Sequence, residues 1–216
     1  MRKGLCINMI ELNEYLHNPC GTSSIPYWKS QSITVPSDMK ILHADDLHPS
    51  EWLDYSDEPY FCLSHNLKKL SAPVLGEGYL LCDASLADFA AHINFCYDAI
   101  DVNESQLQKY ILRPVYDAAL WIAVRERQTG EIVATGIGEL DREVGEGVLE
   151  WIQVSEGYRG RGLGSFVVME LLRRMQGRAR FATVSGQCNN PSNPEGLYRK
   201  CGFTGNDVWH ILRRKE

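Results

Sequence analysis

A glycine-rich turn between an apolar segment and an amphipathic segment constrains the fold of this chain more than any other feature. The apolar segment, residues 147–154, reads GVLEWIQV, and the turn, residues 159–164, reads RGRGLG. Glycine lets the backbone approach a ligand closely, and the first N–H groups of a helix have no partner within that helix. A strand that passes through such a turn into a helix therefore builds an anion cradle, and a phosphate-bearing cofactor is its natural occupant.

The spacing of the glycines argues against three familiar phosphate-binding loops. A dinucleotide-binding fingerprint requires G-x-G-x-x-G, but Ser165 stands where the third glycine would be. A Walker A loop requires Gly-Lys-Ser/Thr, which occurs nowhere in the chain. A protein kinase would need the H-R-D and D-F-G elements, which are also absent from the sequence.

The turn resembles the acyl-CoA pyrophosphate loop of GNAT-type N-acetyltransferases, (Q/R)-x-x-G-x-(G/A), through Arg159, Gly162 and Gly164. Residues 197–203, LYRKCGF, are similar to a second signature of that family, LY-x-x-x-GF. The resemblance covers about residues 78–213. It implies the α+β GNAT fold, in which helices flank a mixed, mostly antiparallel sheet that opens beside its fourth strand to form a cofactor cleft.

The character of the sequence changes near residue 77, which suggests an irregular N-terminal extension over 1–77 and an acetyltransferase domain over 78–216. The extension has little periodicity, contains six prolines and predicts one short helix at residues 9–17. It is also rich in aromatic residues, unlike a disordered segment. We therefore expect it to pack on the domain that follows and to contribute to the acceptor site.

From residue 78 onward the hydrophobic pattern is regular and predicts strands and helices in a mixed order. The predicted strands are residues 79–82, 119–125, 131–140, 148–154, 181–185 and 208–212. The predicted helices are residues 85–97, capped by Ser85, and 104–112, 163–176 and 194–201. This order favours an α+β fold over a regular βαβ repeat.

Composition narrows the class of protein. The chain has 216 residues, 44% of them hydrophobic, which is enough for one full core and a small appendage. Its formal net charge of −6 disfavours nucleic acid as a partner. The sequence contains no run of eighteen apolar residues and its first residues lack the apolar stretch of a signal peptide, so we expect neither a membrane span nor export.

The cysteines and histidines indicate a reduced, metal-free protein. Seven cysteines at irregular spacings suit neither a disulfide framework nor a C-x-x-C metal site. No two of the six histidines stand at a typical metal-ligand spacing. We expect reduced thiols, a cytoplasmic location and no metal.

The resemblance implies acetyl-CoA as cosubstrate and assigns residues to its parts. The pyrophosphate would be bound by Arg159, Gly160, Arg161, Gly162, Leu163, Gly164 and Ser165. The thioester oxygen and the pantetheine arm would meet backbone groups of Ile152, Gln153 and Val154. Asn190 or Asn193 would contact the arm, although the family's asparagine position is occupied here by a proline, and Asn193 is equally suited to cap the helix that begins at Pro194.

Two residues are candidates for acid–base catalysis. Tyr198 matches the family's general acid, which protonates the leaving thiolate, and the alternative is a tyrosine that packs in the core. Glu150 matches an acidic residue that acts on the amine. The alternative is a half-exposed strand residue, because Glu150 faces either the core or the cleft depending on a bulge that such strands often carry.

The resemblance implies an N-acetyltransferase that moves the acetyl group of acetyl-CoA directly to a primary amine of a small molecule or protein. The alternative is a non-catalytic acyl-CoA-binding sensor, which would not need Tyr198 or the base. A nucleotide-binding protein that uses only the glycine turn is a more distant alternative. The acceptor cannot be identified from the sequence, and a homodimer is compatible with it.

Overall fold

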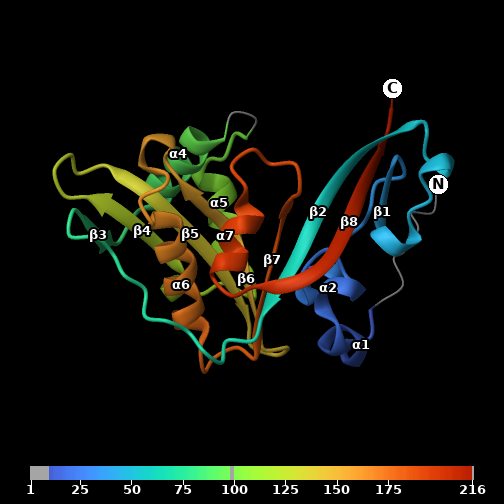
Figure 1. Ribbon diagram of the computed structural model, residues 1–216, viewed down its shortest axis with the longest axis horizontal. Helices are drawn as coiled ribbons and strands as arrows, with labels where there is room; N and C mark the ends of the chain where they lie inside the picture. The colour runs from blue at the N-terminus through green and yellow to red at the C-terminus, as the bar shows by residue number, and fades with distance from the viewer. Residues whose placement is uncertain (1–9, 98–99, 216) are drawn as a thin grey trace. The chain divides into compact units, whose positions relative to one another are not determined.

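The computed structural model describes residues 10–97 and 100–215, which form two compact units (Figure 1). One unit combines the N-terminal residues up to His65 with Thr183 and all that follows it, and the other spans Asn66–Ala182. No helix within the described ranges is long and apolar enough to cross a membrane.

The Asn66–Ala182 unit is built on four strands in the order β6-β5-β4-β3. The strands are β3 (Tyr79–Cys82), β4 (Trp121–Glu126), β5 (Ile132–Asp141) and β6 (Glu146–Val154). The three pairings between neighbours are antiparallel. The helices are α4 (Leu86–Cys96), α5 (Glu104–Ile111) and α6 (Leu163–Met175), with 3-10 turns at η3 (Ala118–Leu120) and η4 (Glu156–Tyr158).

Capping side chains determine where α4 and α5 begin. Ser85 and Asp88 form a reciprocal capping box at the start of α4, and Asn103 and Gln106 form one at the start of α5. Each box satisfies N–H groups that the first turn of a helix leaves without partners. Apolar residues of both helices and of β4 and β5 then form one buried cluster, which contains Phe89, Ala90, Ile93, Leu107, Ala123 and Ile137.

The unit that holds both chain ends contains strands in the order β1-β8-β2-β7. Their bounds are β1 (Met39–His43), β2 (Tyr55–His65), β7 (Phe181–Gln187) and β8 (Thr204–Arg214). The long strand β8 pairs antiparallel with β1 on one side and with β2 on the other. The helical segments are α1 (Leu12–His17), α2 (Pro19–Thr22), α3 (Tyr27–Ser30), α7 (Pro194–Lys200), η1 (Ala44–Asp46) and η2 (Pro49–Glu51).

The predicted strands and helices after residue 78 are all present, and the antiparallel pairing with flanking helices agrees with the predicted α+β class. The helix predicted at 9–17 is α1 (Leu12–His17), and Met9 lies outside the described residues. The sequence did not predict β1 and β2. A proline inside a segment argues against a strand, yet Pro59 lies in the middle of β2, opposite His210 of β8.

Helix α6 lies close to β5 because two glycines leave room for its side chains. Val167 and Leu171 of α6 are fully buried. A Cβ added at Gly136 of β5 would lie 2.5 Å from Val167 Cγ1 and 3.0 Å from Leu171 Cδ1. This close approach holds the N-terminal end of α6 beside the end of β6.

We expect Gly136→Ala to lower the free energy of unfolding by about 1–3 kcal/mol, because the added methyl group overpacks this contact. Chemical denaturation would measure the loss. Gly78→Ala is the matched control, since a Cβ there would meet no atom within 4 Å. Equal stability of the two variants would contradict the packing account.

Candidate functional site

The glycine turn has the backbone geometry of an anion cradle. It follows β6 and η4, and its glycines Gly160 (φ 76°) and Gly162 (φ 83°) are both in the left-handed region that favours glycine. Gly162 is the N-cap residue of α6, and no side chain accepts a hydrogen bond there. The N–H groups of Leu163, Gly164 and Ser165 therefore begin the helix without a side-chain cap, at its positive end.

Arginine side chains add positive charge to this turn. Arg161 is exposed, donates from Nη2 to the carbonyl of Gly157 at 3.0 Å, and lies over the ring of Tyr158 with its Cζ 4.9 Å from the ring centroid. Arg159 is also exposed and donates from Nε to the carbonyl of Val154 at 3.3 Å. Both guanidinium groups are thus anchored by carbonyls of the turn and strand and retain further donors for an anion.

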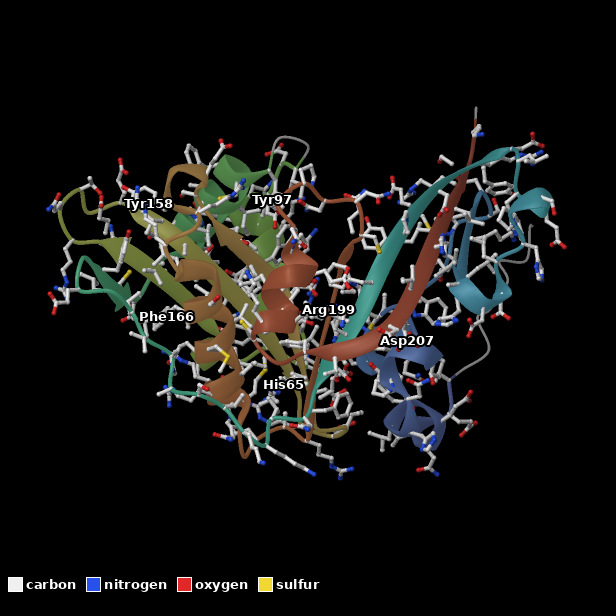
Figure 2. The ribbon with its side chains drawn as sticks, viewed as in Figure 1. His65, Tyr97, Tyr158, Phe166, Arg199 and Asp207 are labelled. Atoms are coloured by element: carbon white, nitrogen blue, oxygen red, sulfur yellow. The ribbon has the colours of Figure 1, made fainter. Side chains whose placement is uncertain are left out.

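Tyr158 connects the turn to the β4–β5 hairpin (Figure 2). Its hydroxyl donates to Oε2 of Glu126 at 2.8 Å. That hydrogen bond raises the pKa of Tyr158 and lowers the pKa of Glu126, because it favours the carboxylate and the protonated phenol. The glycine turn is therefore linked to the β4–β5 hairpin as well as to α6.

Glu150 occupies a β-bulge in β6. Gly138 of β5 lies opposite Leu149 and Ile137 lies opposite Trp151, so Glu150 is the extra residue that has no partner in the β5 register. A bulge re-aims the side chain at its position. The alternation of side chains along a strand could not show whether Glu150 faces the core or the cleft, and the bulge sets this orientation. The Glu150 side chain is 18% exposed.

A tyrosine and an arginine fix the carboxylate of Glu150. Tyr110 Oη donates to Glu150 Oε1 at 3.3 Å and accepts from Trp151 Nε1 at 3.2 Å. Arg113 Nη1 lies 3.6 Å from Glu150 Oε1, forms an ion pair with the buried Glu139, and stacks on the Tyr110 ring. Burial, and next the charge of Glu150, raise the pKa of Tyr110, so its hydroxyl remains a donor.

Tyr110, Arg113 and Glu139 were not predicted as parts of this network. They come from the end of α5, the residues after it, and β5, and only the fold brings them to β6. No motif marks them in the sequence. The only signal was the position of two carboxylates, Glu139 and Glu150, on strands joined by a hairpin.

A second polar cluster is buried on the α4 side of the same strands. His92 Nδ1 lies 2.9 Å from Thr135 Oγ1, and its Nε2 lies 3.0 Å from Ser155 Oγ. Gln153 donates from Nε2 to Thr135 Oγ1, which places its side chain in this cluster. Burial lowers the pKa of His92 to about 4, so the imidazole is neutral at pH 7.

A pocket of about 540 Å³ lies beside this cluster and reaches the segment before the glycine turn. Its polar lining comprises His92 and Ser155 together with the charged residues Asp88, Arg125 and Glu131, and Tyr158 also lines it. This pocket was not predicted, because its lining residues come from α4, two strands and η4, which only the fold brings together.

The carbonyls at the end of β6 are approached by side chains. Ile152 lies opposite Gly136 of β5, and its carbonyl accepts from the hydroxyl of Tyr97 at 3.5 Å (Figure 2). The carbonyl of Val154 accepts a hydrogen bond from Nε of Arg159. The side chains of Ile152 and Val154 are partly exposed.

The remaining predicted residues lie in the unit that holds both chain ends. Tyr198 of α7 is buried, at 6% exposure, with its ring centroid 6.1 Å from that of Phe61 and 5.8 Å from that of Phe203. Asn193 caps α7, because its Oδ1 accepts from Gly196 N at 3.0 Å. Asn190 Oδ1 accepts from the N–H of Ser192 at 2.9 Å and from its hydroxyl at 2.7 Å.

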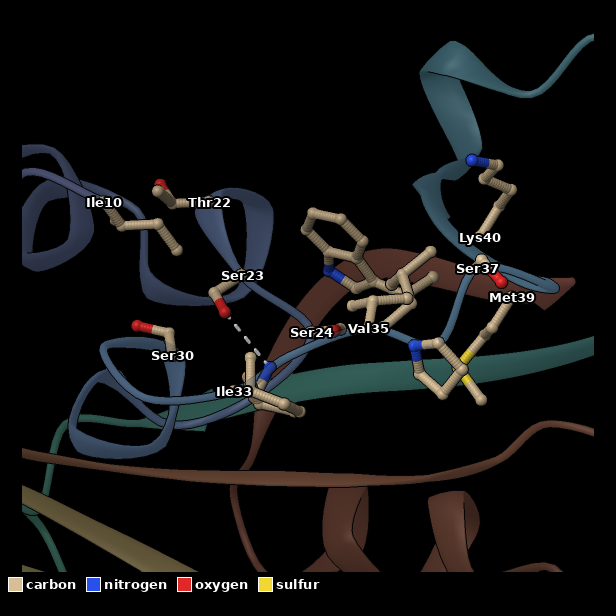
Figure 3. Close-up of a pocket in the computed structure, with 14 residues that line it drawn as sticks. Ile10, Thr22, Ser23, Ser24, Ser30, Ile33, Val35, Ser37, Met39 and Lys40 are labelled. Carbon is tan, nitrogen blue, oxygen red and sulfur yellow. Dashed lines mark hydrogen bonds between the residues drawn. The ribbon is translucent and has the colours of Figure 1, made fainter. Parts of the chain in front are cut away.

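This unit also contains an apolar pocket between its N-terminal segment and β8 (Figure 3). Its wall includes the aliphatic side chains of Ile10, Ile33 and Val35, together with Met39 and Trp209. Serine residues line part of the rim. In neither unit do three or more metal-ligating side chains of the described residues gather in a group that could hold a metal ion.

Comparisons with known proteins place the chain in one family. The model of the acetyltransferase (GNAT) family matches residues 87–203. The chain is similar to the crystal structure of a GCN5-related N-acetyltransferase from Sphaerobacter thermophilus, at TM-score 0.67 and 19% identity over 82% of this chain and 61% of that one. It is also similar to an acetyltransferase of the GNAT family from Colwellia psychrerythraea, at TM-score 0.57 and 16% identity over 87% of this chain and 69% of that one.

A third similar structure is the GCN5-related glucosamine N-acetyltransferase region of a fungal multi-domain GH3 β-N-acetylglucosaminidase, at TM-score 0.56 and 15% identity over 73% of this chain and 21% of that one. The chain spans less than two thirds of the length of the Sphaerobacter protein. None of the curated proteins matches the chain. At these identities the structures share the fold, and they confirm the predicted GNAT fold.

We expect Gly162→Ala to lower the free energy of unfolding by about 1–2 kcal/mol, because a Cβ is disfavoured in the left-handed region. Chemical denaturation would measure this. Gly157→Ala is the control from the same connection, since Gly157 has no positive φ and a Cβ there would meet no atom within 4 Å. If the Gly162→Ala variant were as stable as the Gly157→Ala control, the prediction that a Cβ strains the turn at position 162 would be wrong.

We expect the pH dependence of stability to contain a contribution from His92. Its pKa is about 4 in the folded chain against 6.5 ordinarily, so protonation favours the unfolded chain. The stability it contributes is complete above pH 6.5 and is lost as the pH falls through 4, by up to about 3 kcal/mol. His92→Gln should flatten the curve in this window when unfolding is measured from pH 7 to pH 4. The exposed control His48→Gln should keep the wild-type slope, and an equally flat control would contradict the assignment to His92.

Proposed function

The chain belongs to the acetyltransferase (GNAT) family, and from this premise we propose that it transfers the acetyl group of acetyl-CoA directly to a primary amine of a small molecule or protein. One observation carries the proposal. The glycine turn between β6 and α6 has left-handed glycines at positions 160 and 162 and leads into a helix without a side-chain cap. We place this activity in the cytoplasm.

The proposal assigns the coenzyme's pyrophosphate to the first turn of α6. The uncapped N–H groups from Leu163 to Ser165 would donate to its oxygens, and the positive end of the helix favours their charge. Arg159 and Arg161 would add charge-assisted hydrogen bonds from their exposed guanidinium groups. Backbone groups from Ile152 to Val154 would meet the pantetheine arm and the thioester oxygen.

Glu150 would act as the general base. An ammonium group must lose a proton before its nitrogen can attack the thioester, and Glu150 is the bulged residue of β6. Its carboxylate is oriented by Tyr110 and lies 3.6 Å from Arg113, so it is positioned before any substrate binds. A carboxylate that removes a proton from an ammonium group does so directly or through one water molecule.

Tyr198 would act as the general acid that protonates the leaving thiolate. A tyrosine hydroxyl is among the side-chain groups that can act as a general acid. Its aromatic neighbours Phe61 and Phe203 hold the ring in one orientation. We further propose that Asn190 or Asn193 contacts the arm, in addition to the bond of Asn190 to Ser192 and the capping of α7 by Asn193.

The N-terminal extension would contribute to the choice of acceptor. Its apolar pocket, lined by Ile33, Val35 and Trp209 among others, would suit an aliphatic or aromatic part of the acceptor molecule (Figure 3).

A second candidate function is a non-catalytic sensor of acyl-CoA. The burial of Tyr198 between two aromatic rings favours it, because a packing residue needs no role in proton transfer. Such a sensor would bind the coenzyme and release no thiol.

We expect the purified chain to release free thiol from acetyl-CoA in the presence of a suitable member of a panel of amines. Glu150→Gln and Tyr198→Phe should each lower kcat by roughly 10²-fold or more, the effect of losing an acid or base, with little change in the affinity for acetyl-CoA measured by calorimetry. Glu77→Gln is the control, because Glu77 is exposed.

Different outcomes separate the hypotheses. Binding of coenzyme A without thiol release by any amine supports the sensor. Equal losses of affinity and turnover in Tyr198→Phe indicate a packing role for this residue. No heat with coenzyme A or acetyl-CoA, together with clear binding of ATP or a dinucleotide, contradicts both candidates.

A further inference from the structure

Two buried thiols in the unit that holds both chain ends are in direct contact. Cys20 lies in α2 and Cys62 lies in β2, 42 positions apart, and their Sγ atoms are 2.7 Å apart. Their residues are 3% and 6% exposed. A disulfide bond needs a separation of roughly 2.0 Å, so only a small approach of the two sulfur atoms is required.

The fold holds these two segments together by contacts that do not involve sulfur. Trp209 of β8 donates from Nε1 to the carbonyl of Cys20 at 2.7 Å. On the same strand, Asp207 lies opposite Cys62 in the β2–β8 pairing. A Cβ added at Gly21 would lie 3.0 Å from Asp207 Oδ1, so α2 approaches β8 closely. Both thiols are therefore positioned against one strand.

The local backbone of α2 is also defined. Asn18 caps this short helix, with its Oδ1 accepting from Gly21 N at 3.2 Å. Cys62 directly precedes the irregularity in β2, since the register with β8 shifts between Cys62 and Ser64. The cap and the ladder fix the backbone positions from which the two side chains converge.

We propose that Cys20 and Cys62 are a redox modification site, at which a small-molecule disulfide such as oxidised glutathione converts the two thiols into an intramolecular disulfide. One thiol loses its proton, and its thiolate attacks a sulfur of the reagent and releases one glutathione thiolate. The second cysteine, also as thiolate, attacks the protein sulfur of this mixed disulfide and releases the other glutathione. The reagent thus gains two electrons, and the protein loses two protons and two electrons.

The bond would link α2 covalently to β2, both within the N-terminal extension. It would close a segment of 42 residues, which restricts the unfolded chain and stabilises the folded one. Because both sulfur atoms are buried, the reagent would reach them through local opening of α2, so oxidation should be slow compared with that of an exposed thiol. The inference does not depend on acetyl transfer.

The test uses the full chain, treated with oxidised glutathione or with dithiothreitol, followed by alkylation and digestion without reduction. We expect mass spectrometry to find one linked peptide pair that joins Cys20 to Cys62 and disappears after reduction. We also expect the oxidised chain to unfold at a temperature higher by roughly 5–15 °C than the reduced chain.

Single variants define the pair. Cys20→Ser and Cys62→Ser should each abolish the link and the temperature shift, whereas Cys82→Ser should retain both. Peptide mapping of the unmutated chain keeps the proposal testable if a variant fails to fold. Full alkylation of both cysteines after oxidation, or a link that joins either of them to another cysteine, would overturn the proposal.

Discussion

The site depends on one constraint, the close packing of α6 against β5 and β6. Gly136 of β5 and Gly147 of β6 carry no side chain where α6 crosses, and a Cβ at either would lie 2.5 Å from an atom of the helix. The helix therefore cannot shift without losing contacts of Val167 and Leu171, both fully buried. Since α6 is held in this way, its uncapped N-terminus is held at the end of β6, which is what an anion-binding turn requires.

Two different buried polar networks involve strands β5 and β6. Glu139 and Glu150 share the guanidinium of Arg113 on one part of the β5–β6 hairpin. On the α4 side, a neutral imidazole at His92 joins hydroxyl groups of Thr135 and Ser155. Burying an ion is costly unless it is paired, whereas a neutral hydrogen-bonded group is tolerated. The same strands therefore hold a paired carboxylate at Glu150 and a neutral imidazole at His92.

The regular part of the chain was predictable because local signals agreed with the fold. Ser85 is followed three residues later by Asp88, and the two form the capping box that begins α4. The glycines at 160 and 162 marked the turn before α6, where both adopt positive φ. The strands β1 and β2 were not predictable. Pro59 and the weak alternation of apolar and polar residues in β2 do not indicate a strand. Its register is set by pairing with β8, some 150 residues later in the sequence.

Local patterns were enough to predict the glycine turn, the order of strands and helices after residue 78, and the family to which both signatures point, because these depend on residues close together in the chain. The folded structure was needed to show which way Glu150 points, because a bulge depends on the register between two strands. It also decided the partners of Glu150, the neutrality of His92 and the contact between Cys20 and Cys62. Each of these joins residues from different elements, and such distances are set by packing, which local patterns do not encode.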